Sequence, residues 1–476
     1  MPKKKVGPVD IYNLLPKTNC GKCPQKTCMG FAVQLAERKA TLDQCPPLYE
    51  EKYKENLAKL SELLAPPVRE IVIGSGDRQV KIGGELVLRR HELRYFNPPP
   101  IAVVIDDSMP EDAILKTVKE TEEFKHLYVG TYLRLDMVAV RSTSEDPEKF
   151  EKAVKTVAEA TNMPLILWAL NPAVLERGLA LVKDRRPLLY AATAENWQAM
   201  GELASKYGCP LTIYSPNNIR LLRSMVKTLK LWGIEDLALD VGCSFGEGLS
   251  ETINNLTMLR TSAIRDEDEL SGLPLIGTPI RVWDEGNGEK PEVLYWKEAC
   301  LASMMIAKYI DLLMVRSPNK WSVLPLLVLR NNLYNDPVKP VSVEPGLRIV
   351  GKPNEDSPVL VTTNFALTYY TVMSDFEKLD CYVLVVDTEG LSVESAVAGR
   401  KFTADKVADV IKSSGIEAKI KHRTMILPGM AARLKGEIED LTKWDVLVGP
   451  KDSSAIASFL KEKWEGKDHT PGWTYR

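Results

Sequence analysis

The stretch IAVVIDD, residues 101–107, is the first of eight short apolar runs that decide the fold of the middle of this chain. Each run has the length of one buried strand, and helix-like sequence separates it from the next. Such alternation over about 220 residues predicts a closed, TIM-like (β/α)8 barrel with parallel strands inside and helices outside. The eight runs are residues 101–105, 135–140, 165–169, 188–191, 211–214, 237–241, 274–276 and 312–315.

The C-terminal part of the chain repeats this alternation on a smaller scale. An open, doubly wound, Rossmann-like α/β sheet is the fold that this pattern predicts. Ligands of such sheets bind at the carboxyl ends of the strands, which here are Thr363-Asn364, Thr388 to Gly390, Pro428-Gly429 and Gly449-Pro450. The apolar runs are residues 359–362, 381–387, 418–420, 425–427 and 444–448.

Proline-rich stretches divide the chain into an α/β multidomain protein. They lie at residues 65–67 and 97–100 and between residues 331 and 351. The predicted domains are a small N-terminal domain at 1–65, the barrel at 66–335 with a short β-rich entry segment at 66–97, and the α/β domain at 345–476.

The end of the first domain has the pattern of an amphipathic helix. Tyr53, Leu57, Leu60 and Leu64 recur at helical spacing and would share one face. We expect this face to dock on the next domain.

Composition excludes several classes of function. The 476 residues carry 62 Lys and Arg against 64 Asp and Glu, a net charge of -2, which does not predict binding to nucleic acid or to an anionic membrane. The apolar run from Leu301 to Val315 contains charged residues and is shorter than the roughly 20 residues of a membrane span. The first residues lack the apolar core of a secretory signal. We therefore expect a cytoplasmic protein that binds small molecules or protein partners.

Four cysteines near the N-terminus have the spacing of a metal site. Cys20, Cys23, Cys28 and Cys45 form the pattern C-x2-C-x4-C-x16-C, and proline follows the second and the fourth. Clustered thiolates bind either an iron-sulfur cluster or tetrahedral zinc, and the x4 gap and the prolines favour a 4Fe-4S cluster. The other cysteines lie singly in apolar contexts typical of buried, inert thiols; they are Cys209, Cys243, Cys300 and Cys381.

Motifs for nucleotide chemistry are absent from the sequence. It contains no P-loop, and Gly242, Gly246 and Gly248 form only a weak glycine pattern at a barrel strand end. None of the four histidines lies in the D-x-H-x-x-G arrangement that supplies a cobalt ligand, and we expect them on the surface or satisfied in the core. They are His91, His126, His422 and His469.

Three C-terminal stretches, TTNFALTYYTV (362–372), DTEGLSVESAVAGRKF (387–402) and MILPGMAARL (425–434), complete a recognisable pattern together with the four cysteines and the barrel. The whole chain resembles the large subunit of the corrinoid iron-sulfur protein, called gamma in the archaeal acetyl-CoA decarbonylase/synthase complex. This resemblance implies a 4Fe-4S cluster on the four cysteines and a corrinoid, or cobamide, in the C-terminal domain, whose cobalt lacks a protein axial ligand.

The resemblance also implies a function, that of a corrinoid iron-sulfur methyl carrier and Co-methyltransferase subunit. Such a protein accepts a methyl group from a methylated tetrahydropterin, of the tetrahydromethanopterin or tetrahydrosarcinapterin type, on Co(I) and passes it reversibly to the nickel site of acetyl-CoA synthase. The cluster reductively reactivates Co(II). The implied partners are a small (delta) subunit in a heterodimer and the acetyl-CoA synthase and carbon monoxide dehydrogenase subunits.

Corrinoid contacts follow from the resemblance residue by residue. Ser395 falls in the stretch that resembles the family's cap below the cobalt face, where a small hydroxyl residue replaces a ligand. Turn and cap chemistry explains the same residue types equally well. The implied contacts are Thr363, Asn364, Thr388, Gly390, Ser392, Ser395, Gly399, Pro428 and Gly429.

Polar residues at the predicted barrel strand ends leave a further question open. Similar barrels in pterin-dependent methyltransferases hold the pterin ring with Asp and Asn, but solvated loops or a docking surface account for the same pattern. These residues are Asp106, Asp107, Asn171, Asn196, Asn217, Asn218 and Asp240.

Two alternatives of other classes remain. The chain could be an electron-transfer activator for another corrinoid protein, with no corrinoid of its own, or a scaffold with a structural zinc site.

Overall fold

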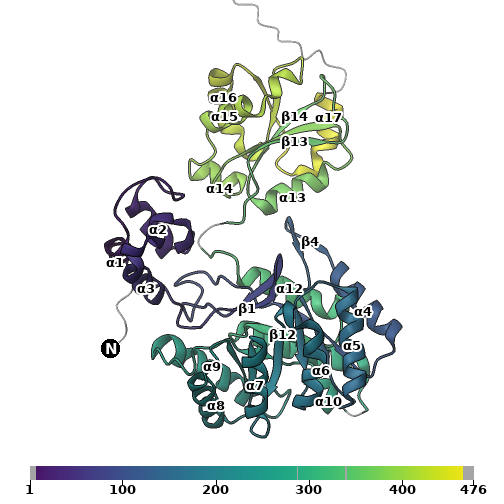
Figure 1. The fold of residues 1–476 in the computed structure, drawn as a ribbon. Coiled ribbons are helices and arrows are strands. Elements are labelled where there is room, and N and C mark those ends of the chain that lie inside the picture. The colour runs from purple at the N-terminus through teal and green to yellow at the C-terminus, as the bar shows by residue number, and fades with distance from the viewer. Residues whose placement is uncertain (1–6, 287, 338–339, 465–476) are drawn as a thin grey trace, which may run out of the picture. The chain divides into compact units, whose positions relative to one another are not determined.

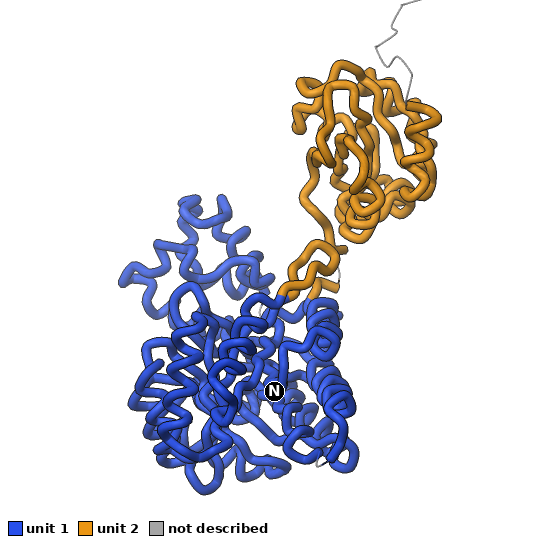
Figure 2. Tube along the Cα trace, turned by 90° about the vertical axis from the view of Figure 1, so that its right-hand side faces the viewer, with its two compact units in different colours: residues 1–124, 134–334 blue, residues 125–133, 335–476 orange. Residues whose placement is uncertain are grey.

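A computed structural model describes residues 7–286, 288–337 and 340–464 of the chain, which form two compact units. The first unit comprises residues up to 124 together with 134–334, and the second comprises residues 125–133 and those from 335 onward (Figure 2). No helix within the described ranges is long and apolar enough to cross a membrane.

Three short helices and several 3-10 turns form the N-terminal domain. Ile11, Phe31, Leu48 and Leu60 are fully or almost fully buried in its core. The prediction that the apolar face of residues 53–64 docks on the next domain was wrong. Leu60 and its neighbours on that face pack into this small core, because two short helices alone bury too little apolar surface. The helices are α1 (Pro8–Leu14), α2 (Cys28–Ala36) and α3 (Lys54–Leu63), with turns at Leu42–Gln44, Pro46–Tyr49 and Glu51–Tyr53.

The predicted barrel is confirmed. Eight parallel strands follow the order β10-β9-β8-β7-β6-β3-β12-β11, and a parallel bridge between Leu239 and Leu275 closes the ring. The apolar run that begins at Pro274 forms its strand two residues later than expected. The strands are β3 (Ile101–Asp106), β6 (Met137–Arg141), β7 (Leu165–Trp168), β8 (Leu188–Ala192), β9 (Leu211–Tyr214), β10 (Leu237–Asp240), β11 (Ile276–Gly277) and β12 (Leu312–Val315).

Helices surround these strands (Figure 1). Several begin at a side-chain cap. Asp146, for example, precedes α5, and its carboxylate accepts from the backbone N–H groups of Glu148 and Lys149; Pro147 is the first residue of that helix. The helices are α4 (Glu111–Glu123), α5 (Pro147–Ala160), α6 (Pro172–Val182), α7 (Trp197–Tyr207), α8 (Ile219–Leu231), α9 (Leu249–Arg265), α10 (Arg281–Glu285), α11 (Pro291–Ala307) and α12 (Lys320–Leu333).

A hairpin of β1 (Ile71–Ser75) and β2 (Arg78–Ile82) plugs the amino end of the barrel. Ile71, Ile73 and Ile82 are buried among the side chains of the barrel interior. The backbone N–H of Gly74 donates to the carbonyl of Arg186, which lies just before β8. The β-rich entry segment therefore closes one end of the barrel, and the carboxyl ends of the strands form its mouth.

The C-terminal domain is built on a five-stranded sheet of order β13-β15-β14-β16-β17. Two predictions were wrong here: residues 418–420 form no strand, since the 3-10 turn Ile416–Ala418 ends there, and the antiparallel edge strand β13 was missed. The strands are β13 (Gly346–Val350), β14 (Val359–Thr363), β15 (Cys381–Val386), β16 (Thr424–Leu427) and β17 (Asp445–Val448).

Helices cover both faces of this sheet, as a doubly wound domain requires (Figure 1). Residues of α14, α15 and α16 pack on one face, and residues of α13 and α17 pack on the other. The helices are α13 (Ala366–Asp375), α14 (Val393–Ala398), α15 (Ala404–Ser414), α16 (Lys435–Thr442) and α17 (Ile456–Lys463).

A second hairpin, β4 (His126–Tyr128) and β5 (Thr131–Leu133), belongs to the same unit as the C-terminal sheet, although its sequence lies between barrel elements. Its turn packs closely on α13, because a Cβ on Gly130 would overlap the Tyr370 ring. The sequence prediction missed this hairpin.

Candidate functional site

The four N-terminal cysteines line one pocket. Cys28 is the first residue of α2, and Cys45 precedes the turn Pro46–Tyr49. In the described part of the chain, no three His, Cys, Asp or Glu side chains are arranged to hold a single metal ion. The pocket thus gathers four thiols without the geometry of a mononuclear site.

Local hydrogen bonds set the path of the chain around these thiols. The Asn19 side chain accepts from the backbone N–H of Cys28 at 2.8 Å, and the Thr27 hydroxyl caps α2 by accepting from the N–H of Gly30 at 3.1 Å. Gly21 has a φ of +66°, which favours glycine between the first two cysteines. The sequence prediction did not single out Asn19 or Thr27.

Electrostatics in the pocket suit a group that carries positive charge. Burial raises the pKa of Cys45, and the nearby thiols of Cys23, Cys28 and Cys20 act in the same direction. A hydrogen bond from the Lys22 backbone, followed by one from the Thr18 side chain, lowers the pKa of Cys20. Four thiolates crowded together repel one another unless metal ions bind them. The donor set therefore fits an iron-sulfur cluster.

A cavity of about 420 Å³ lies at the carboxyl ends of β14, β16 and β17. Its wall is largely apolar, from α13, α17 and the sheet, with a few polar groups, which is the usual composition of a small-molecule site. Thr362 lines this cavity, and its buried hydroxyl has no hydrogen-bond partner among the described residues. The sequence prediction named the neighbouring Thr363 instead, whose buried hydroxyl is likewise unpartnered.

Some of the predicted corrinoid contacts form part of the wall of this cavity. Ser392 and Pro428 line it, and Gly429 follows directly. A Cβ on Gly429 would lie 2.8 Å from the carbonyl oxygen of Gly449, so only glycine lets the loops after β16 and β17 meet. The backbone N–H of Gly429 donates to the Pro450 carbonyl at 3.0 Å.

Three other predicted corrinoid contacts, Asn364, Thr388 and Gly390, stabilise a loop by hydrogen bonds. The Asn364 Oδ1 accepts from the backbone N–H and the hydroxyl of Thr388, both at 2.9 Å, and from the N–H of Gly390 at 3.0 Å. Asn364 directly follows β14, Thr388 and Gly390 lie in the turn after β15, and none of the three residues lines the cavity. They position the loop that leads to Ser392.

Ser395 lies on the exposed side of the short helix α14. The Ser392 hydroxyl donates to the Ser395 hydroxyl at 3.2 Å, and the Gly399 backbone N–H donates to the Ser395 carbonyl at 2.8 Å. Ser395 and Gly399 are therefore not part of the cavity wall, and the hydrogen bond of Ser395 with Ser392 connects them to it.

Most of the polar residues predicted at the barrel strand ends stabilise loops. Asp107 accepts hydrogen bonds from the backbone of Thr143 and Ser144, and Asn196 bonds to the backbone on both sides of its turn. Asn171 and Asn218 cap helices, and Asn217 accepts from the side chain of Asn255. Only Asp106 and Asp240 remain inside the mouth of the barrel.

The remaining cysteines and histidines follow the predictions with one exception. Cys209, Cys243 and Cys381 are buried, whereas Cys300 is exposed on α11, because it falls on the outer side of that helix. His91 is exposed, and both ring nitrogens of His422 meet backbone groups of Ser357 and Thr424. His469 lies outside the described residues.

Comparisons with known proteins match both parts of the chain. A family model described as "CO dehydrogenase/acetyl-CoA synthase delta subunit" matches residues 70–460, and one described as "Putative Fe-S cluster" matches residues 15–47. The acetyl-CoA decarbonylase/synthase complex subunit gamma 2 of Methanosarcina thermophila is 44% identical over 466 residues, covering 97% of this chain and 99% of that protein. The subunit gamma of Archaeoglobus fulgidus is 44% identical over 473 residues, covering 98% and 100%. Among solved structures, dihydropteroate synthase from Thermus thermophilus is similar, with 16% identity and a TM-score of 0.41, covering 56% of this chain and 100% of that one.

Proposed function

Because this chain belongs to the family of acetyl-CoA decarbonylase/synthase complex gamma subunits, we propose that it is the large subunit of a corrinoid iron-sulfur protein and acts as a methyl carrier. The match of residues 15–47 to an Fe-S cluster family supports an iron-sulfur cofactor in its N-terminal domain. We further propose the bound corrinoid, the methyl-transfer reaction and the partner subunits described below.

The observation that carries the proposal is the cavity at the carboxyl ends of β14, β16 and β17. It lies where open α/β sheets bind ligands, and Thr362 on its wall has a buried hydroxyl with no hydrogen-bond partner among the described residues. Ser392 and Pro428 form the wall, and Gly429 lets two loops meet there. We propose that a corrinoid binds against these residues, and its cobalt would supply the capacity to take up and release a methyl group.

The rest of the proposed corrinoid set has supporting roles. Asn364, Thr388 and Gly390 hold the loop after β15, and Thr363 ends the strand beside the cavity. Ser395 belongs to the short helix that follows Ser392, and Gly399 ends that helix. In the proposed complex, the small Ser395 hydroxyl would stand in place of a ligand below the cobalt.

No histidine of the described chain lines the cavity. The His422 ring is held by backbone groups of Ser357 and Thr424. We therefore infer a cobalt without a protein axial ligand. A missing imidazole favours the lower oxidation states of cobalt, because a strong axial donor stabilises the higher ones.

Cys20, Cys23, Cys28 and Cys45 are the proposed ligands of a 4Fe-4S cluster, which supplies low-potential electrons that keep the cobalt active. Asn19 accepts from the backbone N–H of Cys28, one of these ligands, and Thr27 caps the start of α2, the helix that Cys28 begins. Backbone hydrogen bonds of this kind also tune the potential of a cluster.

The proposed methyl donor is a methylated tetrahydropterin, and the proposed acceptor is the nickel site of acetyl-CoA synthase. A small (delta) subunit would form a heterodimer with this chain, beside the carbon monoxide dehydrogenase subunits, in the cytoplasm. Transfer in both directions is expected.

The test is a metal analysis of the full chain, purified anaerobically with its small subunit. We expect cobalt and iron near a ratio of about one to four, for one corrinoid and one four-iron cluster. Electron paramagnetic resonance should show base-off Co(II). Iron without cobalt in the presence of the small subunit would overturn the carrier function and favour an electron-transfer activator.

A further inference from the structure

A buried cluster of ionisable side chains lies at the amino end of the barrel, away from its mouth. It lines one small cavity, to which α9, the loop before β12, the end of α12 and the entry segment each contribute. The rings of Tyr95 and Tyr334 lie 5.4 Å apart in it. We call this set the floor cluster, and its members are Glu85, Tyr95, Arg260, Tyr309, Asp311 and Tyr334.

One ion pair of the floor cluster is closed on itself. Arg260 pairs with Asp311, and the two side chains are only 1% and 2% exposed. The Arg260 Nη2 also donates to the carbonyl of Tyr309 at 2.7 Å. Asp311 Oδ2 accepts in addition from the backbone N–H of Leu275 at 2.7 Å. Because the two opposite charges offset each other, the pair leaves no net charge to stabilise a third ion.

Glu85 is the third ionisable group in this space. It is 6% exposed, and both of its carboxyl oxygens are buried without a hydrogen-bond partner in the described chain. Burial raises the pKa of Glu85 to about 8, and the charge of Asp311 acts in the same direction. The guanidinium groups of Arg260 and of Arg38, which comes from the N-terminal domain, oppose this only in part. Glu85 therefore fits the closed structure in its neutral form.

The cavity gives the ionised form no room for hydration. Its volume is about 10 Å³, which is the space of one water molecule. One water satisfies a neutral carboxyl group but not a carboxylate, whose burial without charge compensation is far more costly. Ionised Glu85 must therefore reach solvent, and this requires the entry segment to leave the barrel.

Close packing of the backbone fixes where the entry segment can open. Gly83 and Gly84 precede Glu85 with φ of +75° and +81°, which favours glycine at both positions. A Cβ on Gly83 would lie 2.2 Å from the carbonyl oxygen of Arg69, so the chain is held tightly at this point. The part free to move is the stretch after Gly84, residues 85–97.

This stretch covers the end of α12. Tyr95 packs on Tyr334, and the Arg90 guanidinium donates to the carbonyl of Asn332 at 3.0 Å. Tyr334 is the last residue of the first unit, from which the chain continues into the second, and the entry segment follows the N-terminal domain. Both connections of the barrel to the rest of the chain therefore meet at the floor cluster.

We propose that Glu85 is a proton-dependent anchor, which holds residues 85–97 and the end of α12 on the barrel when its carboxyl group is protonated and releases both when the proton passes to solvent. The anchor goes beyond the proposed function and does not depend on a bound corrinoid. It makes the two connections of the barrel more mobile at alkaline pH, while the barrel itself stays folded.

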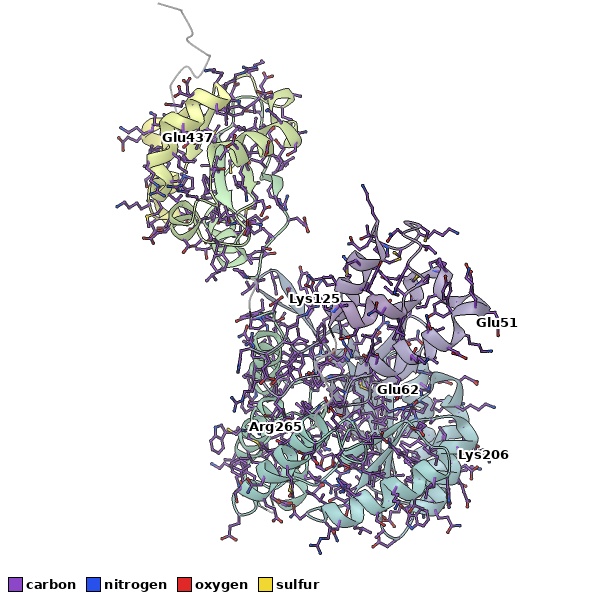
Figure 3. All side chains as sticks on the ribbon, turned by 90° about the vertical axis from the view of Figure 1, so that its left-hand side faces the viewer. Glu51, Glu62, Lys125, Lys206, Arg265 and Glu437 are labelled. Atoms are coloured by element: carbon purple, nitrogen blue, oxygen red, sulfur yellow. The ribbon has the colours of Figure 1, made fainter. Side chains whose placement is uncertain are left out.

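The test is hydrogen–deuterium exchange of the full chain, purified anaerobically with its small subunit, read by mass spectrometry and corrected for the intrinsic pH dependence of exchange. The readout is the opening equilibrium of residues 85–97 and of the end of α12. Strand β15, in the core of the second unit, reports unfolding outside the anchor. The principal variant is Glu85→Gln, which keeps the shape of the neutral side chain. The matched control is Glu62→Gln on the exposed side of α3, labelled in Figure 3.

We expect the opening equilibrium of both segments to rise about tenfold for each pH unit between about pH 6 and about pH 8 and to level off above, because the open state binds one proton fewer. In Glu85→Gln it should not change with pH, and Glu62→Gln should behave as the native chain does. Exchange in β15 should stay constant throughout.

Three results would overturn the anchor. They are a pH-independent opening of residues 85–97 in the native chain, the same pH profile in Glu85→Gln, and a loss of protection that extends equally to β15. Corrinoid content enters none of these measurements, so failure of the anchor leaves the carrier function untouched, and failure of the carrier function leaves the anchor untouched.

Discussion

Gly429 lies where the loops after β16 and β17 meet, and its replacement by alanine should damage both the fold and the proposed corrinoid cavity. A Cβ there would stand 2.8 Å from the Gly449 carbonyl oxygen, 2.8 Å from the Pro450 carbonyl carbon and 2.9 Å from the Lys451 nitrogen. All three are backbone atoms, which cannot rotate away as a side chain can. Forced overpacking of this kind costs about 1–3 kcal/mol.

Gly436 provides a matched control in the same domain. It lies in α16, beside Glu437, which Figure 3 labels. Apart from its chain neighbours and the backbone of its own helix, a Cβ there would have no atom of the described chain within 4 Å. Alanine at this position should stabilise the helix by about 0.5–1 kcal/mol, because glycine loses more backbone entropy on folding.

Urea unfolding of the native chain, Gly429→Ala and Gly436→Ala measures both effects. The midpoint should fall in the first variant and stay or rise in the second. Corrinoid content per chain should fall only in the first, because the shifted loops carry Pro428 and the far wall of the cavity. An unchanged midpoint in Gly429→Ala would refute the steric argument, and an unchanged corrinoid content beside a lowered midpoint would remove this loop from the binding site.

Three further predictions concern other parts of the chain. Cys23→Ala should abolish reductive reactivation but leave methyl transfer from pre-reduced protein largely intact; a variant that reactivates normally would rule out the cluster assignment. Asp311→Asn should lower the free energy of unfolding by about 3–5 kcal/mol, because it leaves the charge of Arg260 buried without its partner, whereas breaking the exposed pair of Arg177 should cost at most about 1 kcal/mol in the same assay. Burial raises the pKa of Glu85 to about 8, so the folded state holds a proton that the unfolded state releases near pH 4.3. The free energy of unfolding should therefore fall as the pH rises from about 4.3 to about 8. A Glu85→Gln variant whose unfolding curves show the same pH dependence as the native chain would contradict this.

Much of the fold could be predicted from periodicity. Parallel strands buried on both sides appear as unbroken apolar runs, which is why runs such as Leu211–Tyr214 and Leu312–Val315 became strands with the expected bounds. The hairpin at 126–133 and the edge strand β13 escaped, because their residues are only partly buried and show no such run. Residues 418–420 show the converse error: this short apolar stretch was predicted as a strand, but it follows α15 at the end of a 3-10 turn.

The site was predictable where the signal is local and missed where it is not. Four cysteines in one short segment must lie close together, and they line one pocket. Asn171 and Asn218 follow strands as binding residues do, yet they cap the next helices, and a sequence alone does not separate these roles. Strand parity offered a signal that was overlooked: counting by two from the apolar interior position Ala139 leads directly to Arg141, which the sequence prediction did not name.

By itself, the sequence determined the alternation of strands and helices, the clustering of the thiols and the family pattern, because these depend on neighbours along the chain. Only the tertiary structure decided that α3 closes the core of its own domain, that Gly429 meets Gly449, and that Arg281 lies over the ends of strands far away in sequence. Ring closure brings residues from eight strands to one mouth, and such contacts depend on how the sheet curves and closes. No local pattern of residues records that geometry.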